Sequence, residues 1–336
     1  MPSLTLLLRR CRRFLAGEAA FPDAGENPLR GQTRRFTVAQ GIVRGFYAFL
    51  LYVAVSQLSS RTGSDLLVRH ADAPLWPAAW LRWTHGEVGN RTLLAFYGAT
   101  NIAGAFFVRF RAVRVAVFLG VLEFVALKNS FGKIGHSQHF LVIVAGALVF
   151  LPIGWTLPAS TVPRRARQET LLAVWLAQAA ILLTYTMSGL GKLLGAVYQL
   201  SLGQMNVFLP GAFGAHIAQR LVQTSSHSTL GDWIIHHPYL TWPLMPSAVA
   251  FEMVALLAAF RPVLARPVAV LLILFHVGTY FTMTISFPVN CFLLALFFLA
   301  SPFEPVNPCW QNLLFALPCA RKAWTFMQSG KKRPRD

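Results

Sequence analysis

The sequence predicts an all-α integral membrane protein with about eight transmembrane helices and both termini in the cytoplasm. Three observations predict this fold class. The chain of 336 residues is 55% hydrophobic and only 12% charged, with a mean hydropathy of +0.52. Apolar runs near the length of about 18 residues that spans a bilayer recur along the chain. The charged residues gather in short clusters between these runs, as membrane topology requires.

Eight apolar segments are predicted to be the spans, because each is close to the length that crosses a bilayer. In chain order they are Phe36–Leu58, Thr92–Val108, Val113–Leu127, His139–Trp155, Glu169–Leu190, Pro243–Phe260, Pro267–Met283 and Pro288–Ala300. Proline opens each of the last three, and proline is tolerated in the first turn of a helix. Arginines lie between the second and third spans, between the fourth and fifth, and between the sixth and seventh.

The basic residues set the orientation, because Lys and Arg are enriched in cytoplasmic loops. With the N-terminus inside, most of the 30 Lys and Arg residues fall on the inner side. Both termini are therefore expected in the cytoplasm. The chain divides into a basic N-terminal segment, 1–35, a transmembrane domain, 36–305, and a basic tail, 306–336.

Several other classes of protein are excluded by composition and order. The formal charge of +18 is not arranged as a basic stripe interleaved with aromatic residues, so no nucleic-acid partner is expected. The 4 cysteines form no CxxC pair, and no metal is expected. In "MPSLTLLLRRCRRFL" the apolar patch precedes the arginines, the reverse of a signal peptide. The first span is therefore expected to be the insertion signal.

Ionisable and polar residues within or beside the spans mark the candidate site, because such residues are costly in lipid and often functional. On the predicted topology they gather toward the outer side. They are His136 and His139 at the mouth of the fourth span, Tyr185, Ser188 and Lys192 in or just beyond the fifth, Glu252 in the sixth, and His276 in the seventh. The inner halves of the spans hold few such residues. A one-sided pocket that opens outward is therefore expected.

The segment "YTMSGLGKLL" holds the most informative cluster. Tyr185, Ser188 and Lys192 are spaced i, i+3 and i+7, which places them on one face of a helix. Gly189 and Gly191 permit a close backbone approach or a break beside the amine. A lysine amine in partly dry surroundings can act as a general base. The spacing favours a functional lysine.

Structural interpretations of the same residues stay open. Glu252 and His276 could form a pair that ties two neighbouring spans together, since neither is cheaply left in lipid. His136 and His139 could simply be solvated at the membrane interface. His276 alone could be a hydrogen-bonded core histidine. The sequence does not decide between these interpretations and a catalytic cluster.

Four segments resemble the membrane part of the vitamin K-dependent gamma-glutamyl carboxylases. "YTMSGLGKLL" resembles the family's Tyr-x-x-x-Gly-x-x-Lys-Leu pattern, matching Tyr185, Gly189, Lys192 and Leu193. "GHSQHFLVIVAGALVF" resembles its Asn-His-Ser segment, with His136 the closest match and His139 the alternative. "AFEMVALLAAFRP" resembles the span with a single acid, here Glu252. "LFHVGTYFTMTISFPVNCFLLALFFLASPFE" resembles its Phe-His span, giving His276. The broader family is that of the HTTM, or horizontally transferred transmembrane, domain proteins.

The resemblance implies a chemistry and a set of partners. Lys192 would deprotonate a hydroquinone, reduced vitamin K or menaquinol, and O2 and CO2 would be consumed as a substrate is carboxylated at the outer face. His136 or His139 and His276 would stabilise developing charge, while Tyr185 and Glu252 would position the quinone or the lysine. The expected location is a bacterial cytoplasmic membrane, with the lipid bilayer, a quinol and a secreted peptide or protein as partners.

The sequence also departs from the carboxylases. Where the family has two adjacent lysines, the first position here is Gly191, and "LGAVYQL" replaces the acidic residues that follow. The family's large outer domain for substrate recognition has no counterpart. The alternative hypothesis is therefore a non-catalytic HTTM membrane factor for the maturation or export of a secreted peptide. A small-solute transporter is the third class, and no pair of broken helices recurs in two halves to favour it.

Overall fold

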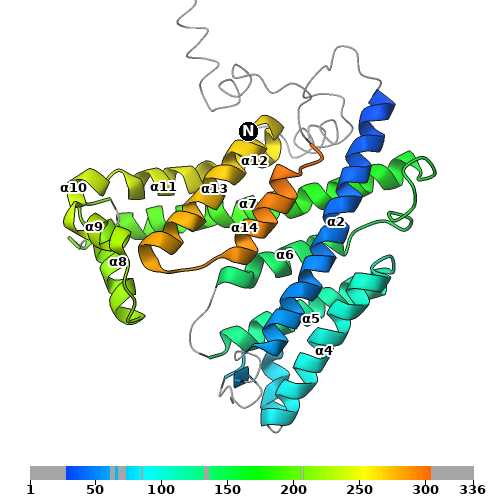
Figure 1. Cartoon of the computed structure of the whole chain (residues 1–336), viewed down its shortest axis with the longest axis horizontal. Helices are drawn as coiled ribbons and strands as arrows, with labels where there is room; N and C mark the ends of the chain where they lie inside the picture. The colour runs from blue at the N-terminus through cyan, green and yellow to red at the C-terminus, as the bar shows by residue number, and fades with distance from the viewer. Residues whose placement is uncertain are drawn as a thin grey trace, which may run out of the picture. The chain divides into compact units, whose positions relative to one another are not determined.

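The computed structural model describes residues 28–60, 65–66, 73–84, 86–131, 136–204, 206 and 208–303. The predicted N-terminal segment lies mostly outside these residues, and the predicted basic tail, 306–336, lies wholly outside them. The described part is helical, with no strand among its residues (Figure 1). The helical fold predicted from hydropathy is therefore confirmed.

The described helices overlap all eight predicted spans. In chain order they are α2 (Pro28–Ser59), η1 (Ala78–Trp83), α4 (Gly86–Phe107), α5 (Arg111–Asn129), η2 (His136–Gln138), α6 (His139–Leu148), α7 (Arg164–Ser201), α8 (Ala212–Gln223), α9 (Thr229–His236), α10 (Pro238–Thr241), α11 (Leu244–Val254), α12 (Leu257–Phe260), α13 (Pro262–Met283), α14 (Pro288–Leu294) and the π-helical η3 (Ala295–Leu299). Helix α6 ends at Leu148, before the predicted end at Trp155, and α7 extends beyond both ends of the predicted fifth span.

Four stretches among the described residues are helical, long and apolar enough to cross a membrane. They are Gln32–Ser59, Arg164–Ser201, Pro238–Phe260 and Pro262–Met283, and His139–Leu148 and Pro288–Leu299 are shorter apolar helices. The chain is thus a helical protein with 4 candidate membrane-crossing helices. The eight-span arrangement and the cytoplasmic termini stay predictions.

The helices form two compact units. The first holds residues 28–181 and 285–302 of the described chain, and the second holds residues 182–284 and 303. Helix α7 belongs to the first unit up to Ile181 and to the second from Leu182. The other three candidate membrane-crossing stretches lie wholly in one unit each: Gln32–Ser59 in the first, and Pro238–Phe260 and Pro262–Met283 in the second.

In the first unit, α2 packs against α4, α4 against α5, and α5 against α6 (Figure 1). The Tyr97 and Phe124 rings stack with centroids 4.1 Å apart, joining α4 to α5. Trp155 is fully buried near the end of α6. This tight apolar packing makes the first unit a helical bundle with its own core.

Arg114, at the start of the predicted third span, lies in the core of the first unit rather than on its surface. Its side chain is only 1% exposed. The guanidinium donates to the carbonyls of Val108 and Arg109 at 3.0 Å and of Leu151 at 2.5 Å. Carbonyl groups at a helix end lack partners within the helix. Arg114 therefore donates hydrogen bonds to backbone carbonyls just beyond the C-terminal ends of α4 and α6.

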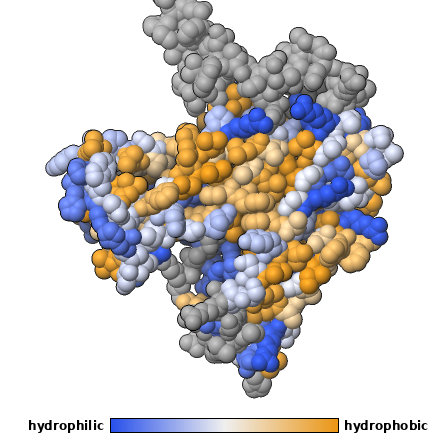
Figure 2. Space-filling model, in the orientation of Figure 1, coloured by the Kyte–Doolittle hydropathy of each residue, from blue (hydrophilic) through white to orange (hydrophobic). Residues whose placement is uncertain are grey.

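In the second unit, α8 and α9 pack against each other and against α13 (Figure 1). Ile217, Leu221 and Ile234 form a small buried cluster, against which Met283 packs. On α13 the residues Leu271, Leu274 and Phe281 are between 50% and 58% exposed. Figure 2 shows this part of the surface as hydrophobic. A helix with an apolar outer face suits contact with lipid.

Candidate functional site

The segment "YTMSGLGKLL", which includes Lys192, lies in the part of α7 that belongs to the second unit. The helix runs unbroken from Arg164 to Ser201, so the glycines beside Lys192 do not interrupt it. Tyr185 is buried and Lys192 is half-buried, whereas Ser188 is exposed. The expected stack of Tyr185, Ser188 and Lys192 is therefore present only in part, because Ser188 faces away from the interior of its unit.

Lys192 forms an ion pair with Glu252 of α11. Its Nζ donates to Glu252 Oε1 at 2.7 Å and to Oε2 at 2.6 Å. The carboxylate side chain is 4% exposed and that of the lysine is 31% exposed. Nζ also lies 6.0 Å from the centre of the Phe275 ring on α13. The pair thus consists of a buried acid and a half-buried lysine.

His276 of α13 has a different partner within the same unit. The Tyr185 hydroxyl and His276 Nε2 are 2.6 Å apart, and both side chains are buried. The hydrogen bond joins α7 to α13, just as the ion pair joins α7 to α11. Of the interpretations that the sequence left open, a direct Glu252–His276 pair is not the one observed, since the Glu252 carboxylate bonds to Lys192. A buried carboxylate is best stabilised by a full opposite charge, which the lysine supplies.

Gly189 permits the close approach of α7 to α11. A Cβ atom at Gly189 would lie 2.8 Å from the Met253 amide nitrogen and 2.9 Å from Glu252 Cβ. A Cβ atom at Gly191 would meet nothing within 4 Å. The requirement for a small residue beside the amine is therefore specific to Gly189, one helical turn before Lys192.

The two histidines at the mouth of the predicted fourth span lie in the first unit. His136 Nδ1 and His139 Nδ1 are 3.4 Å apart, and His139 Nε2 is 3.3 Å from Asn129 Nδ2. The structure thus brings Lys192, Glu252, Tyr185 and His276 together in the second unit. It brings His136 and His139 together in the first.

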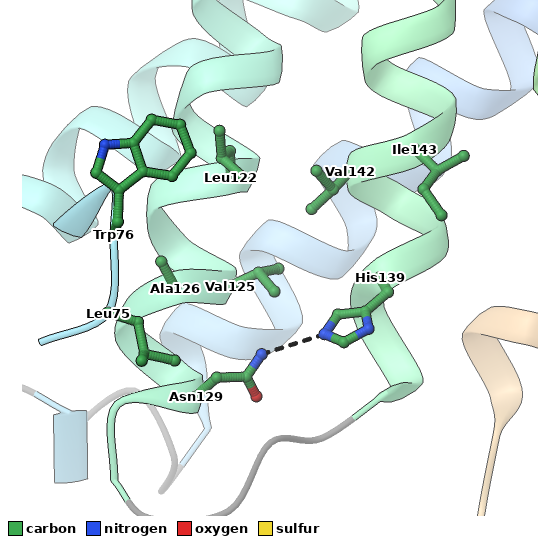
Figure 3. Close-up of a pocket in the computed structure, with 9 residues that line it drawn as sticks. All are labelled: Leu75, Trp76, Leu122, Val125, Ala126, Asn129, His139, Val142 and Ile143. Atoms are coloured by element: carbon green, nitrogen blue, oxygen red, sulfur yellow. Dashed lines mark hydrogen bonds between the residues drawn. The ribbon is translucent and has the colours of Figure 1, made fainter. Parts of the chain in front are cut away.

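An open cavity of about 370 Å³ adjoins His139. At the polar end of this cavity, His139 of α6 faces Asn129 of α5 (Figure 3). The other lining residues are apolar: Leu75, Trp76, Leu122, Val125, Ala126, Val142 and Ile143. The cavity offers one polar pair in an otherwise apolar surface.

Other polar residues near the predicted spans have hydrogen-bond partners within their own unit. Glu123 Oε2 accepts from Trp80 Nε1 at 2.8 Å, and Lys128 Nζ is 3.4 Å from Gln57 Oε1. The rings of His236 and His237 are hydrogen-bonded to backbone carbonyls of their own helical turn. Within the described residues, no group of three His, Cys, Asp or Glu side chains is placed to hold a metal ion.

No protein-family model matches the chain, and neither the curated proteins nor the solved structures include a match. The class of the protein therefore follows from its own fold and site. Its described part is helical with 4 candidate membrane-crossing helices, and a partly buried Lys–Glu pair and a buried Tyr–His pair share one helical unit.

Proposed function

We propose that the protein is a membrane-bound enzyme of the vitamin K-dependent carboxylase type, in which Lys192 is the base that starts the reaction. The observation that carries the proposal is the Lys192–Glu252 pair, in which the carboxylate side chain is buried and the lysine side chain is 31% exposed. Structural ion pairs need no accessible member, whereas a base must reach its substrate. The motif "YTMSGLGKLL", which resembles the carboxylase pattern, supplies the same lysine.

The contact with Glu252 gives Lys192 a route to the neutral amine that a base must have. At 2.6 Å, the proton on Nζ can pass to the carboxylate, leaving an amine and a carboxylic acid. The desolvation that makes a buried ion pair costly also reduces the cost of this transfer. The neutral amine then takes a proton from the substrate and becomes an ammonium, whose counter-ion is the deprotonated substrate, while Glu252 holds the first proton.

Tyr185 and His276 would form a second proton-holding pair beside the first. Their hydrogen bond spans 2.6 Å, and both belong to helices that also contribute to the lysine environment. A histidine–tyrosine pair can donate a hydrogen bond to oxygen that becomes negatively charged. On the proposed topology both pairs face the outer side of the membrane.

The residues around Lys192 fit a hydroquinone. In its neutral form, the amine of the half-buried Lys192 can accept a hydrogen bond from a quinol hydroxyl group. The Phe275 ring, 6.0 Å from Nζ, offers a flat apolar surface against which an aromatic ring can pack. When bound, reduced vitamin K or menaquinol would supply the acidic hydroxyl and the oxidisable ring, with O2 and CO2 as further reactants. The proposed location is a bacterial cytoplasmic membrane.

The proposal is tested with the full chain in lipid nanodiscs, supplied with reduced vitamin K or menaquinol, O2 and 13C-labelled bicarbonate. Mass spectrometry then measures quinone epoxide formation. We expect epoxide from the wild type and none above background from Lys192→Ala. Lys128→Ala is the matched control, because Lys128 lies in the other unit.

Absence of epoxide from the wild type with both quinols would contradict the enzyme and favour the non-catalytic maturation factor. One observation fits that second candidate. Tyr239 and Leu240 of α10 are 78% and 68% exposed, so this short helix presents an apolar surface that a peptide could contact. Copurification of a secreted peptide with the inactive protein would support it.

A further inference from the structure

The hydroxyl of Thr186, one residue after Tyr185 on α7, is inserted into the hydrogen-bond ladder of the helix that carries Glu252. It donates to the Glu252 carbonyl at 3.2 Å and accepts from the Leu256 amide at 3.1 Å. In an unbroken α-helix, the amide four residues after Glu252 would bond directly to the Glu252 carbonyl. The threonine hydroxyl occupies the position between these two groups.

The helix opens at this point. Helix α11 ends at Val254 and α12 begins at Leu257, within one candidate membrane-crossing stretch. The Glu252 carbonyl also accepts from the Ala255 amide at 3.1 Å, in a tighter turn than that of an α-helix. Insertion of a side chain into the ladder is a recognised cause of helix kinks. No proline lies at this break to explain it.

Three residues of α7, each three positions from the next, contact the same residue of the opened helix. Thr186 bonds to the Glu252 carbonyl, and the backbone of Gly189 lies against Glu252 Cβ. Lys192 bonds to the carboxylate. Position 252 is thus held at its backbone, at its Cβ and at its charged end by one helix.

We propose that Thr186 is a positioning residue, which opens the α11–α12 helix and so directs the Glu252 carboxylate to Lys192. With the ladder closed, the Glu252 carbonyl would bond to Leu256, and the turn that carries the carboxylate would rotate relative to α7. Thr186 thereby sets the geometry of the pair without contacting the lysine. Its importance for turnover rests on the proposed function, whereas its effect on the pair does not.

The test measures the reactivity of Lys192 directly. The full chain in nanodiscs is treated with an amine-reactive acetylating reagent, and mass spectrometry follows modification of Lys192 alone over time. Pairing with Glu252 protects the amine, so Glu252→Gln should speed its modification. Thr186→Val, which keeps the shape of threonine without its hydroxyl, should speed modification roughly twofold to tenfold, the range for one lost hydrogen bond. Thr186→Ser keeps the hydroxyl and should restore the wild-type rate.

The double variant separates a positioning role from a general packing defect. In the Glu252→Gln background, Thr186→Val should add no further increase, because Thr186 acts on Lys192 through Glu252. Thr186→Ala is measured beside it, so that poor folding of one variant does not decide the result. Wild-type reactivity in both hydroxyl-free variants, or an equal increase with and without Glu252, would overturn the proposal. This readout needs no turnover, so it stands apart from the test of the enzyme.

Discussion

The Nζ atom of Lys192 lies within 2.7 Å of both carboxylate oxygens of Glu252, although 60 positions separate the residues in the sequence. The acid is buried, whereas the lysine side chain is 31% exposed. This unequal burial determines how each partner should respond to substitution, and the first two predictions follow from it.

Lys192→Arg should be nearly as damaging to catalysis as Lys192→Ala. Arginine preserves the positive charge and the pairing with Glu252, but its guanidinium stays protonated and cannot act as a base. We expect a loss of turnover of about 100-fold or more, the usual contribution of a general base. Epoxide formation at matched expression measures it. Full activity in the arginine variant would show that Lys192 only anchors the helix.

Removal of the lysine should destabilise the protein more than removal of the acid. Lys192→Met leaves a carboxylate that is 4% exposed without its partner, at a cost of about 3 kcal/mol. Glu252→Gln leaves a half-buried lysine that can still donate to the glutamine side-chain oxygen, at a cost of about 1 kcal/mol. Thermal unfolding in nanodiscs compares the two. The double variant Lys192→Met with Glu252→Leu should recover most of the loss. Equal losses for the two single variants would contradict this asymmetry.

Gly189→Ala should be destabilising, and Gly191→Ala should not. The added Cβ at Gly189 would meet the Met253 amide at 2.8 Å, so α7 and α11 would have to separate, at a cost of about 1–3 kcal/mol. At Gly191 the space is open, and alanine should stabilise the helix by up to about 1 kcal/mol. Thermal unfolding is again the measurement. If the two variants unfold at the same temperature, the close approach of α7 to α11 is not required.

The predicted topology places α8 outside and the basic tail inside. In a variant with the 4 native cysteines replaced, single cysteines are introduced at Val222 and at Gly330. Val222 is 79% exposed, so its position in α8 accepts a reagent. A membrane-impermeant maleimide should label Val222→Cys in intact cells and Gly330→Cys only after lysis. Labelling of Gly330→Cys in intact cells would reverse the orientation or require an odd number of spans.

Much of the architecture and the choice of candidate residues could be read from the sequence. Hydropathy is a local property, so the apolar runs predicted the helical class without knowledge of any contact. The cost of charge in lipid is local too, which is why Lys192, Glu252 and His276 stood out before their neighbours were known. Four of the six predicted site residues, with Tyr185 included, lie together in the second unit.

The partners of these residues depended on tertiary structure. Whether Glu252 meets His276 or Lys192 depends on how the helices rotate and cross, and helical spacing within one segment carries no such information. The same geometry assigns the close contact to Gly189 rather than Gly191. His136 and His139 matched the cluster in predicted depth, yet they belong to the other unit. Thr186 gave no signal, since a threonine in an apolar helix is unremarkable until its hydroxyl is seen between the Glu252 carbonyl and the Leu256 amide.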